Sequence, residues 1–197
     1  MTRTSPPRLA RSAALQSVLG RRADTGFVQF PQMTQPKPGE RGLSQPPAAL
    51  EPIRIVLAGP DHLGPATEIV DEYQESFDIV VRDSPHELTR YLAPPYGFWL
   101  VQQGAETLGC IALRPLPIAG EGEIKRLFLR PTARGQGLSD RLLDALESFA
   151  REQGYRRLLL DSKDDLVAAL RFYRRRGYEP VERYNDNPQA TVFLAVR

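Results

Sequence analysis

Residues 123–139 read EIKRLFLRPTARGQGLS. The first part is an apolar run typical of a strand, and Pro131 marks the end of that strand. A short loop with Gly135 and Gly137 follows. Apolar residues then recur at the spacing of one helical face, which predicts a helix over about 137–153. The loop therefore leads from a strand directly into the amino end of an amphipathic helix.

Such a loop is suited to hold an anion. The backbone N–H groups in the first turn of a helix have no partner inside the helix, and the helix dipole places partial positive charge there. Glycine lets the backbone approach an oxygen atom closely. The spacing lacks the Gly-Lys-Ser/Thr of a P-loop and differs from the G-x-G-x-x-G of dinucleotide sites. On spacing alone, an ordinary turn and a phosphate-binding loop explain it equally well.

Short strand and helix patterns continue on both sides of this loop. Strand patterns fall at 53–57, 98–102, 108–113, 123–129, 157–161, 178–184 and 190–196. Helix patterns fall at 61–77, 85–92, 137–153 and 163–176. Ser84 and Ser162 are the expected caps of the second and fourth helices. This order predicts an α/β (α+β) fold in which helices pack on a mixed sheet.

The first 50 residues differ in composition from the rest of the chain. They hold seven of the 18 prolines and a net charge of +5, whereas residues 51–197 carry a net charge of −3. A segment so poor in apolar patterns cannot bury enough surface to offset its loss of chain entropy. We therefore expect a disordered Pro/Arg-rich tail over 1–50 and one folded domain over 51–197. The basic start of the tail resembles a transit peptide, but a plain tail or a translation start at Met33 is the simpler interpretation.

Composition also argues against several classes of protein. Cys110 is the single cysteine, so no disulfide forms within the chain, and with only His62 and His86 beside it we expect no metal site. The folded part has no excess of positive charge, so no nucleic-acid partner is expected. No apolar run is long enough to cross a bilayer, so we expect no membrane partner and a cytoplasmic location. The sequence leaves open whether the chain forms a homodimer.

Two motifs together resemble the GNAT superfamily of N-acetyltransferases. The first is Arg134-x-x-Gly137-x-Ser139 after the strand end Leu127-Phe128-Leu129-x-Pro131, and the second is Phe172-Tyr173-x-x-x-Gly177-Tyr178. The likeness covers roughly residues 52–197 and includes the order of the elements. It implies a mostly antiparallel sheet of about seven strands with helices packed on it, splayed at the strand that precedes the loop.

The resemblance implies acetyl-CoA as the acyl donor substrate. The loop amides would hold its pyrophosphate, and backbone groups of the splayed strand would pair with its pantetheine arm. The residues expected to bind acetyl-CoA are Leu127, Phe128, Leu129, Arg134, Gly135, Gln136, Gly137, Leu138 and Ser139. Two positions depart from the usual pattern. Ser139 stands where Gly or Ala is common, and Leu166 stands where many relatives place an asparagine that contacts the cofactor.

The resemblance also assigns two catalytic residues. Tyr173 would give a proton to the departing CoA thiolate, and the alternative is an aromatic residue that only packs in the core. Glu123 would accept a proton from the attacking amine, directly or through water. The alternative for Glu123 is a solvated carboxylate at a strand end, paired with Lys125 or Arg126.

The implied function is an N-acetyltransferase in which an amine attacks acetyl-CoA directly in a ternary complex. The acceptor amine, a small molecule or a peptide, would be bordered by residues 68–95 and 185–188. The alternative is a non-catalytic module that binds acyl-CoA or a protein partner.

Overall fold

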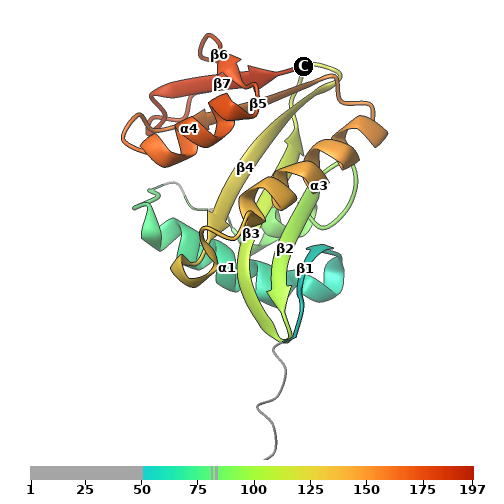
Figure 1. Ribbon diagram of the computed structural model, residues 1–197. Coiled ribbons are helices and arrows are strands. Elements are labelled where there is room, and N and C mark those ends of the chain that lie inside the picture. Colours follow the sequence, from blue (N-terminus) through green and yellow to red (C-terminus); the bar gives the residue numbers. More distant parts are fainter. Residues whose placement is uncertain (1–50, 81, 83) are drawn as a thin grey trace, which may run out of the picture. The chain divides into compact units, whose positions relative to one another are not determined.

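Seven strands form a single sheet at the centre of the structure. The computed structural model describes residues 51–80, 82 and 84–197, so the tail expected over 1–50 lies outside the described residues. The strands are β1 (Ile53–Leu57), β2 (Gly97–Gln103), β3 (Glu106–Pro115), β4 (Glu121–Leu129), β5 (Arg157–Ser162), β6 (Glu179–Pro180) and β7 (Val192–Val196). They lie side by side in the order β1-β2-β3-β4-β5-β7-β6 (Figure 1).

The helices cover both faces of this sheet. They are α1 (Leu63–Ser76), α2 (Pro85–Arg90), α3 (Leu138–Glu152) and α4 (Val167–Arg175), with short 3-10 helices at Pro60–His62 and Pro131–Ala133. In Figure 1, α1 lies behind the strands and α3 in front of them. Among the described helices, none combines the length and the apolar character that crossing a bilayer requires.

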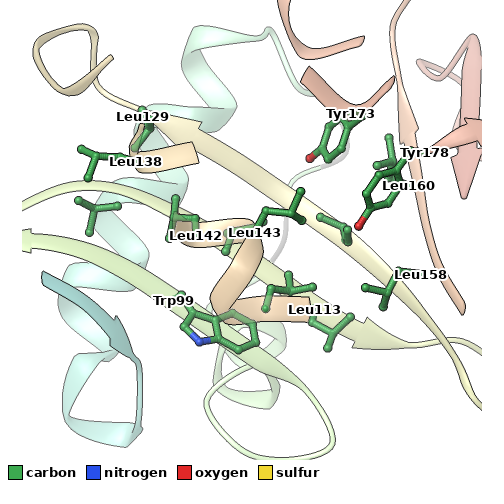
Figure 2. Close-up of a cluster of buried hydrophobic side chains, with 14 of the residues drawn as sticks. Trp99, Leu113, Leu129, Leu138, Leu142, Leu143, Leu158, Leu160, Tyr173 and Tyr178 are labelled. Atoms are coloured by element: carbon green, nitrogen blue, oxygen red, sulfur yellow. The ribbon is translucent and has the colours of Figure 1, made fainter. Parts of the chain in front are cut away.

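Alternating side chains of the strands build a separate core under each face. In β3, Ile111 and Leu113 are buried among residues of α3, whereas Cys110 and Ala112 are buried among residues of α1. This follows from the period of two in a strand, which sends successive side chains to opposite faces. Figure 2 shows the α3 side, where Leu142 and the neighbouring leucines meet Trp99, Tyr173 and Tyr178.

The sheet opens between β4 and β5. All neighbouring strands pair antiparallel except these two, which are parallel. Their pairing covers only Glu121–Glu123 against Arg157–Leu159. Beyond Glu123, no described strand pairs with the edge of β4 that faces β5. The expected splayed, mostly antiparallel sheet is therefore confirmed, and we call the place where the two strands part the fork.

Two expected elements differ from the structure. The fourth helix begins at Val167 rather than just after Ser162. Ser162 instead ends β5, where it is opposite Val192 of β7, because sheet pairing overrides the local capping pattern. The strand expected over 178–184 is only the two-residue β6, since the chain then leaves the sheet toward the fork. The expected cap of α2 is confirmed, because the Glu87 N–H donates to the Ser84 hydroxyl at 3.2 Å.

Ion pairs fasten α4 to α3. Arg176, the residue just after α4, reaches Asp144 and Glu147 of α3, and Arg175 of α4 reaches Asp140 at 3.1 Å. The Tyr178 hydroxyl, just after α4, donates to Glu147 at 3.0 Å. These contacts hold α4, and with it Tyr173, at a fixed position above the open part of the sheet.

A core substitution on α3 tests this packing. Leu143 is completely buried between α3 and the sheet. Leu143→Ala is expected to lower the free energy of unfolding by about 2–5 kcal/mol in urea titration, because it leaves a cavity among side chains that cannot collapse fully. Leu57→Ala on the edge strand, where half of the side chain is exposed, is the control and should cost less than about 1 kcal/mol.

Candidate active site

A cleft of about 1030 Å³ lies at the fork. One wall is β4 from Ile124 to Leu129, and the opposite wall is the end of β5 with the start of α4. The end of α1 and the segment 185–190 close its other sides. The sequence predicted most of these segments as separate strands, helices and turns, and the fold brings them together around one cavity.

A β-bulge turns β4 at the centre of this cleft. Ala112 of β3 pairs with Lys125, but Cys110 pairs with Phe128, so that two residues of β4 oppose Ile111 alone. Arg126 lies in the bulge with a left-handed φ of 57°. The buried Cys110 thiol donates to the Arg126 carbonyl at 3.3 Å, and burial raises its pKa to about 12. The bulge thus directs the unpaired edge of β4 into the cleft.

The glycine loop lies beside this edge. Gly135 and Gly137 have φ values of 75° and 71°, which glycine adopts without strain. A Cβ at either position would meet no atom within 4 Å, so the backbone conformation, and not lack of space, requires glycine. The Arg134 guanidinium donates to the Leu129 carbonyl at 3.0 Å and joins the loop to the end of β4.

The residues expected to bind acetyl-CoA occupy different positions around the cleft. Leu127, Phe128, Leu129, Arg134, Gly135 and Ser139 line it, and Gln136, Gly137 and Leu138 do not. The Leu138 side chain is buried in the core, and the Gln136 amide donates to the Thr132 carbonyl at 3.1 Å. These three residues can therefore contribute backbone N–H groups at the start of α3, but not side chains.

Tyr173 has features that fit both of the roles that the sequence left open. Its ring is only 6% exposed and packs against Phe172 and Tyr178, as a core aromatic would. It also lines the cleft, and its hydroxyl forms no hydrogen bond with another described residue. Figure 2 shows the ring hanging from α4 with its oxygen directed away from Tyr178. Burial raises the pKa of Tyr173 above its ordinary value, so the hydroxyl stays protonated at neutral pH.

Glu123 is buried, unlike the solvated carboxylate that was one of its two interpretations. Its side chain is completely buried, so the expectation of a solvated carboxylate is wrong. One oxygen is paired with Arg114, and the other accepts from Tyr184 at 2.9 Å and from Asn185 at 3.0 Å. Lys125 lies 3.6 Å away, as one of the two expected partners. Glu123 is not among the residues that line the cleft.

The sequence analysis missed Asp161, the next-to-last residue of β5 on the opposite arm of the fork. This carboxylate accepts from Lys125 at 3.0 Å, from Asn185 at 2.9 Å and from Asn187 at 3.0 Å. Burial favours a higher pKa for Asp161, but Lys125 and the two amides outweigh it and hold the pKa below its usual value. The available signal was an aspartate at the end of a strand, together with a turn rich in asparagine.

Comparison with known proteins gives the family. Residues 66–178, more than half of the chain, match the acetyltransferase (GNAT) family. An uncharacterized N-acetyltransferase of Schizosaccharomyces pombe is 33% identical over 140 residues, which are 68% of this chain and 86% of that protein.

Solved structures share the fold. A GNAT-family acetyltransferase from Staphylococcus aureus has a TM-score of 0.65 at 20% identity and covers 73% of this chain and 98% of its own. The PaiA N-acetyltransferase from Thermoplasma acidophilum, in complex with coenzyme A, has a TM-score of 0.60 at 17% identity over 73% of this chain and 98% of its own. The family match makes the chain an acyltransferase. It belongs to the acetyltransferase (GNAT) family, as the two motifs predicted.

The raised tyrosine pKa values predict loss of stability in alkali. Tyr173 and Tyr178 are buried and neutral in the folded chain at pH values where they ionise after unfolding. Their contribution to the free energy of unfolding is therefore complete below a pH of about 10. Above that pH it falls by up to about 1.4 kcal/mol per pH unit for each tyrosine. Urea unfolding at several pH values between about 8 and 11 measures this slope.

Tyr173→Phe isolates the contribution of a single tyrosine. The variant should be as stable as the native chain at neutral pH, because no described residue loses a hydrogen bond. Above a pH of about 10, its free energy of unfolding should fall less steeply with pH than that of the native chain, by the contribution of one tyrosine. An unchanged slope would show that Tyr173 ionises as easily in the folded chain as in the unfolded one.

Proposed function

We propose that the chain transfers an acetyl group from acetyl-CoA to an amine by direct attack in a ternary complex. The observation that carries the proposal is the meeting of three features in one cleft. These are the unpaired edge of β4, the glycine loop at the start of α3, and the Tyr173 hydroxyl. Each of them suits a different part of a thioester substrate with a long phosphorylated carrier.

The loop and the strand edge suit the carrier. The pyrophosphate is an anion, and the free N–H groups at the start of α3 with Arg134 nearby supply donors and positive charge. The pantetheine arm contains amides, which can pair with the open edge of β4 as an added strand would. A protein of the same fold, the Thermoplasma acidophilum N-acetyltransferase, is in complex with coenzyme A, which supports coenzyme A as the carrier.

The reaction needs three further contributions: stabilisation of the charge on the thioester oxygen, a proton for the departing thiolate, and removal of a proton from the amine. The amine nitrogen attacks the thioester carbonyl carbon, and a backbone N–H of the β4 bulge is suited to stabilise the negative charge that develops on oxygen. The carbon–sulfur bond then breaks, and sulfur leaves with the electron pair as a thiolate. Tyr173 gives its proton to this thiolate, which forms in the same dry surroundings that keep the tyrosine protonated.

The amine must also lose a proton. Glu123 was the expected base, but both of its oxygens already accept hydrogen bonds and its side chain does not line the cleft. A direct transfer from the amine to this carboxylate is therefore not part of the proposal. The amine instead gives its proton to a water molecule in the cleft before the nitrogen attacks. The contacts of Glu123 support a positioning role instead.

Removal of the Tyr173 hydroxyl tests the proton donor. Tyr173→Phe should lower kcat by about 100-fold or more, with little change in acetyl-CoA binding, because the thiolate then leaves without its proton. Release of free thiol from acetyl-CoA, measured across a panel of primary amines, reports turnover. Tyr178→Phe is the matched control, since that hydroxyl bonds to Glu147 and does not line the cleft. Acetyl-CoA binding without turnover on any amine would favour the non-catalytic module.

A glycine substitution tests the loop. Gly137→Ala places a Cβ in open space but at a φ of 71°, which costs roughly 1–2 kcal/mol of backbone strain. Relaxation of that strain moves the loop amides, so the Kd for acetyl-CoA should rise by about tenfold. Gly154→Ala is the control: it has a φ of 81° and equally open surroundings at the other end of α3. Equal effects of both variants on acetyl-CoA binding would contradict a role for the loop.

A further inference from the structure

The segment 185–189 crosses from the fork to the end of α1, and it is held at both ends. We call it the strap. It lines the cleft along its whole length. Its own turns are fixed, because the Asn187 N–H donates to the Asn185 side chain and the Gln189 N–H donates to the Asn187 side chain, both at 3.1 Å. Arg183 donates to the Asn187 carbonyl at 3.2 Å and to the Ala190 carbonyl at 2.9 Å.

The first end of the strap is tied to the fork. The Asn185 amide bridges the two arms, since it donates to Glu123 of β4 and to Asp161 of β5. Asn187 adds a second bond to Asp161, and Tyr184 adds a second bond to Glu123. The two carboxylates are also paired with Arg114 and Lys125, which balance their negative charge.

The second end is tied to the chain just after α1. The Gln189 side chain accepts from the Val80 N–H at 3.1 Å and donates to the Asp78 carbonyl at 3.1 Å. Lys163, which follows β5, donates to the Phe77 carbonyl at 3.1 Å. Three hydrogen bonds thus connect the two sides of the cleft at the end of α1.

We propose that the strap closes the acceptor end of the cleft and restricts the acceptor to small-molecule amines, with Glu123 as a positioning residue that holds the strap. This inference rests on the proposed acetyl transfer. An extended peptide that ran past the end of α1 would have to break the Gln189 and Lys163 bonds, whereas a small amine would not. The volume of the cleft also favours a small acceptor. A pocket of roughly 300–1000 Å³ holds one drug-sized ligand. This cleft of about 1030 Å³ must hold part of acetyl-CoA as well, which leaves room for only a small amine.

The test compares acceptors that share a reacting group. Amino-acid amides and tetrapeptide amides that begin with the same residues, together with simple aliphatic amines, are supplied with acetyl-CoA, and thiol release is measured. The native chain should turn over small amines and leave the matched peptides at least about 100-fold less reactive. Gln189→Ala should raise KM for small amines by about tenfold, raise kcat/KM for the peptides, and leave the KM for acetyl-CoA unchanged.

A matched glutamine serves as the control. The Gln103 side chain donates to the Glu51 carbonyl at 2.9 Å on the exposed surface and does not line the cleft. Gln103→Ala should therefore leave both acceptor classes unchanged. Hydrogen exchange provides a readout besides activity, because Gln189→Ala should speed exchange of the Val80 N–H, and Gln103→Ala should not.

Glu123→Gln separates positioning from proton transfer. If Glu123 is a positioning residue, Glu123→Gln should raise the KM for the acceptor and speed hydrogen exchange of the backbone N–H groups in the strap. The pH profile of kcat should keep its native shape. Loss of kcat together with loss of the acidic limb of that profile would identify Glu123 as the base.

The remaining outcomes distinguish the two proposals. Equal turnover of peptides and small amines by the native chain, or no effect of Gln189→Ala on either class, would overturn the strap inference and leave acetyl transfer standing. Acetyl-CoA binding without reaction of any acceptor would overturn both.

Discussion

β4 and β5 are neighbours for three residue pairs and then part, and the whole site depends on this separation. Each strand stays fixed by its other edge, since β4 pairs with β3 as far as Leu129 and β5 pairs with β7 as far as Ser162. The inner edges therefore remain open without loss of order in either strand. Open backbone groups are costly unless they find a partner, so a ligand that carries amides is a natural occupant of the gap.

The fork also determines where the buried charges lie. Glu123 is the last residue of β4 that pairs with β5, and Asp161 lies two residues beyond Leu159, the partner of Glu123 in β5. Carboxylates that are removed from water need cations and donors close by, which Arg114, Lys125 and the strap amides provide. The same contacts tie the strap to the sheet, so one network both balances these charges and shapes this end of the cleft.

The sequence predicted the features that depend on local pattern. The glycine loop, the helix after it and the position of Tyr173 follow from spacing within one or two adjacent elements, and the structure brings them together at the cleft. The burial of Glu123 did not follow, because its partners Tyr184 and Asn185 are about sixty residues away along the chain. The start of α4 was misplaced for a related reason, since pairing with β7 draws Ser162 into β5.

The lone cysteine has a practical consequence. Cys110 is completely buried under the bulge of β4, where its thiol is bonded to a carbonyl and its pKa is raised to about 12. Thiolate is the form that reacts with oxidants and electrophiles, and almost none of it exists at neutral pH under these conditions. The described residues therefore carry no reactive sulfur, so any free thiol measured in a reaction mixture would come from the substrate and not from the protein.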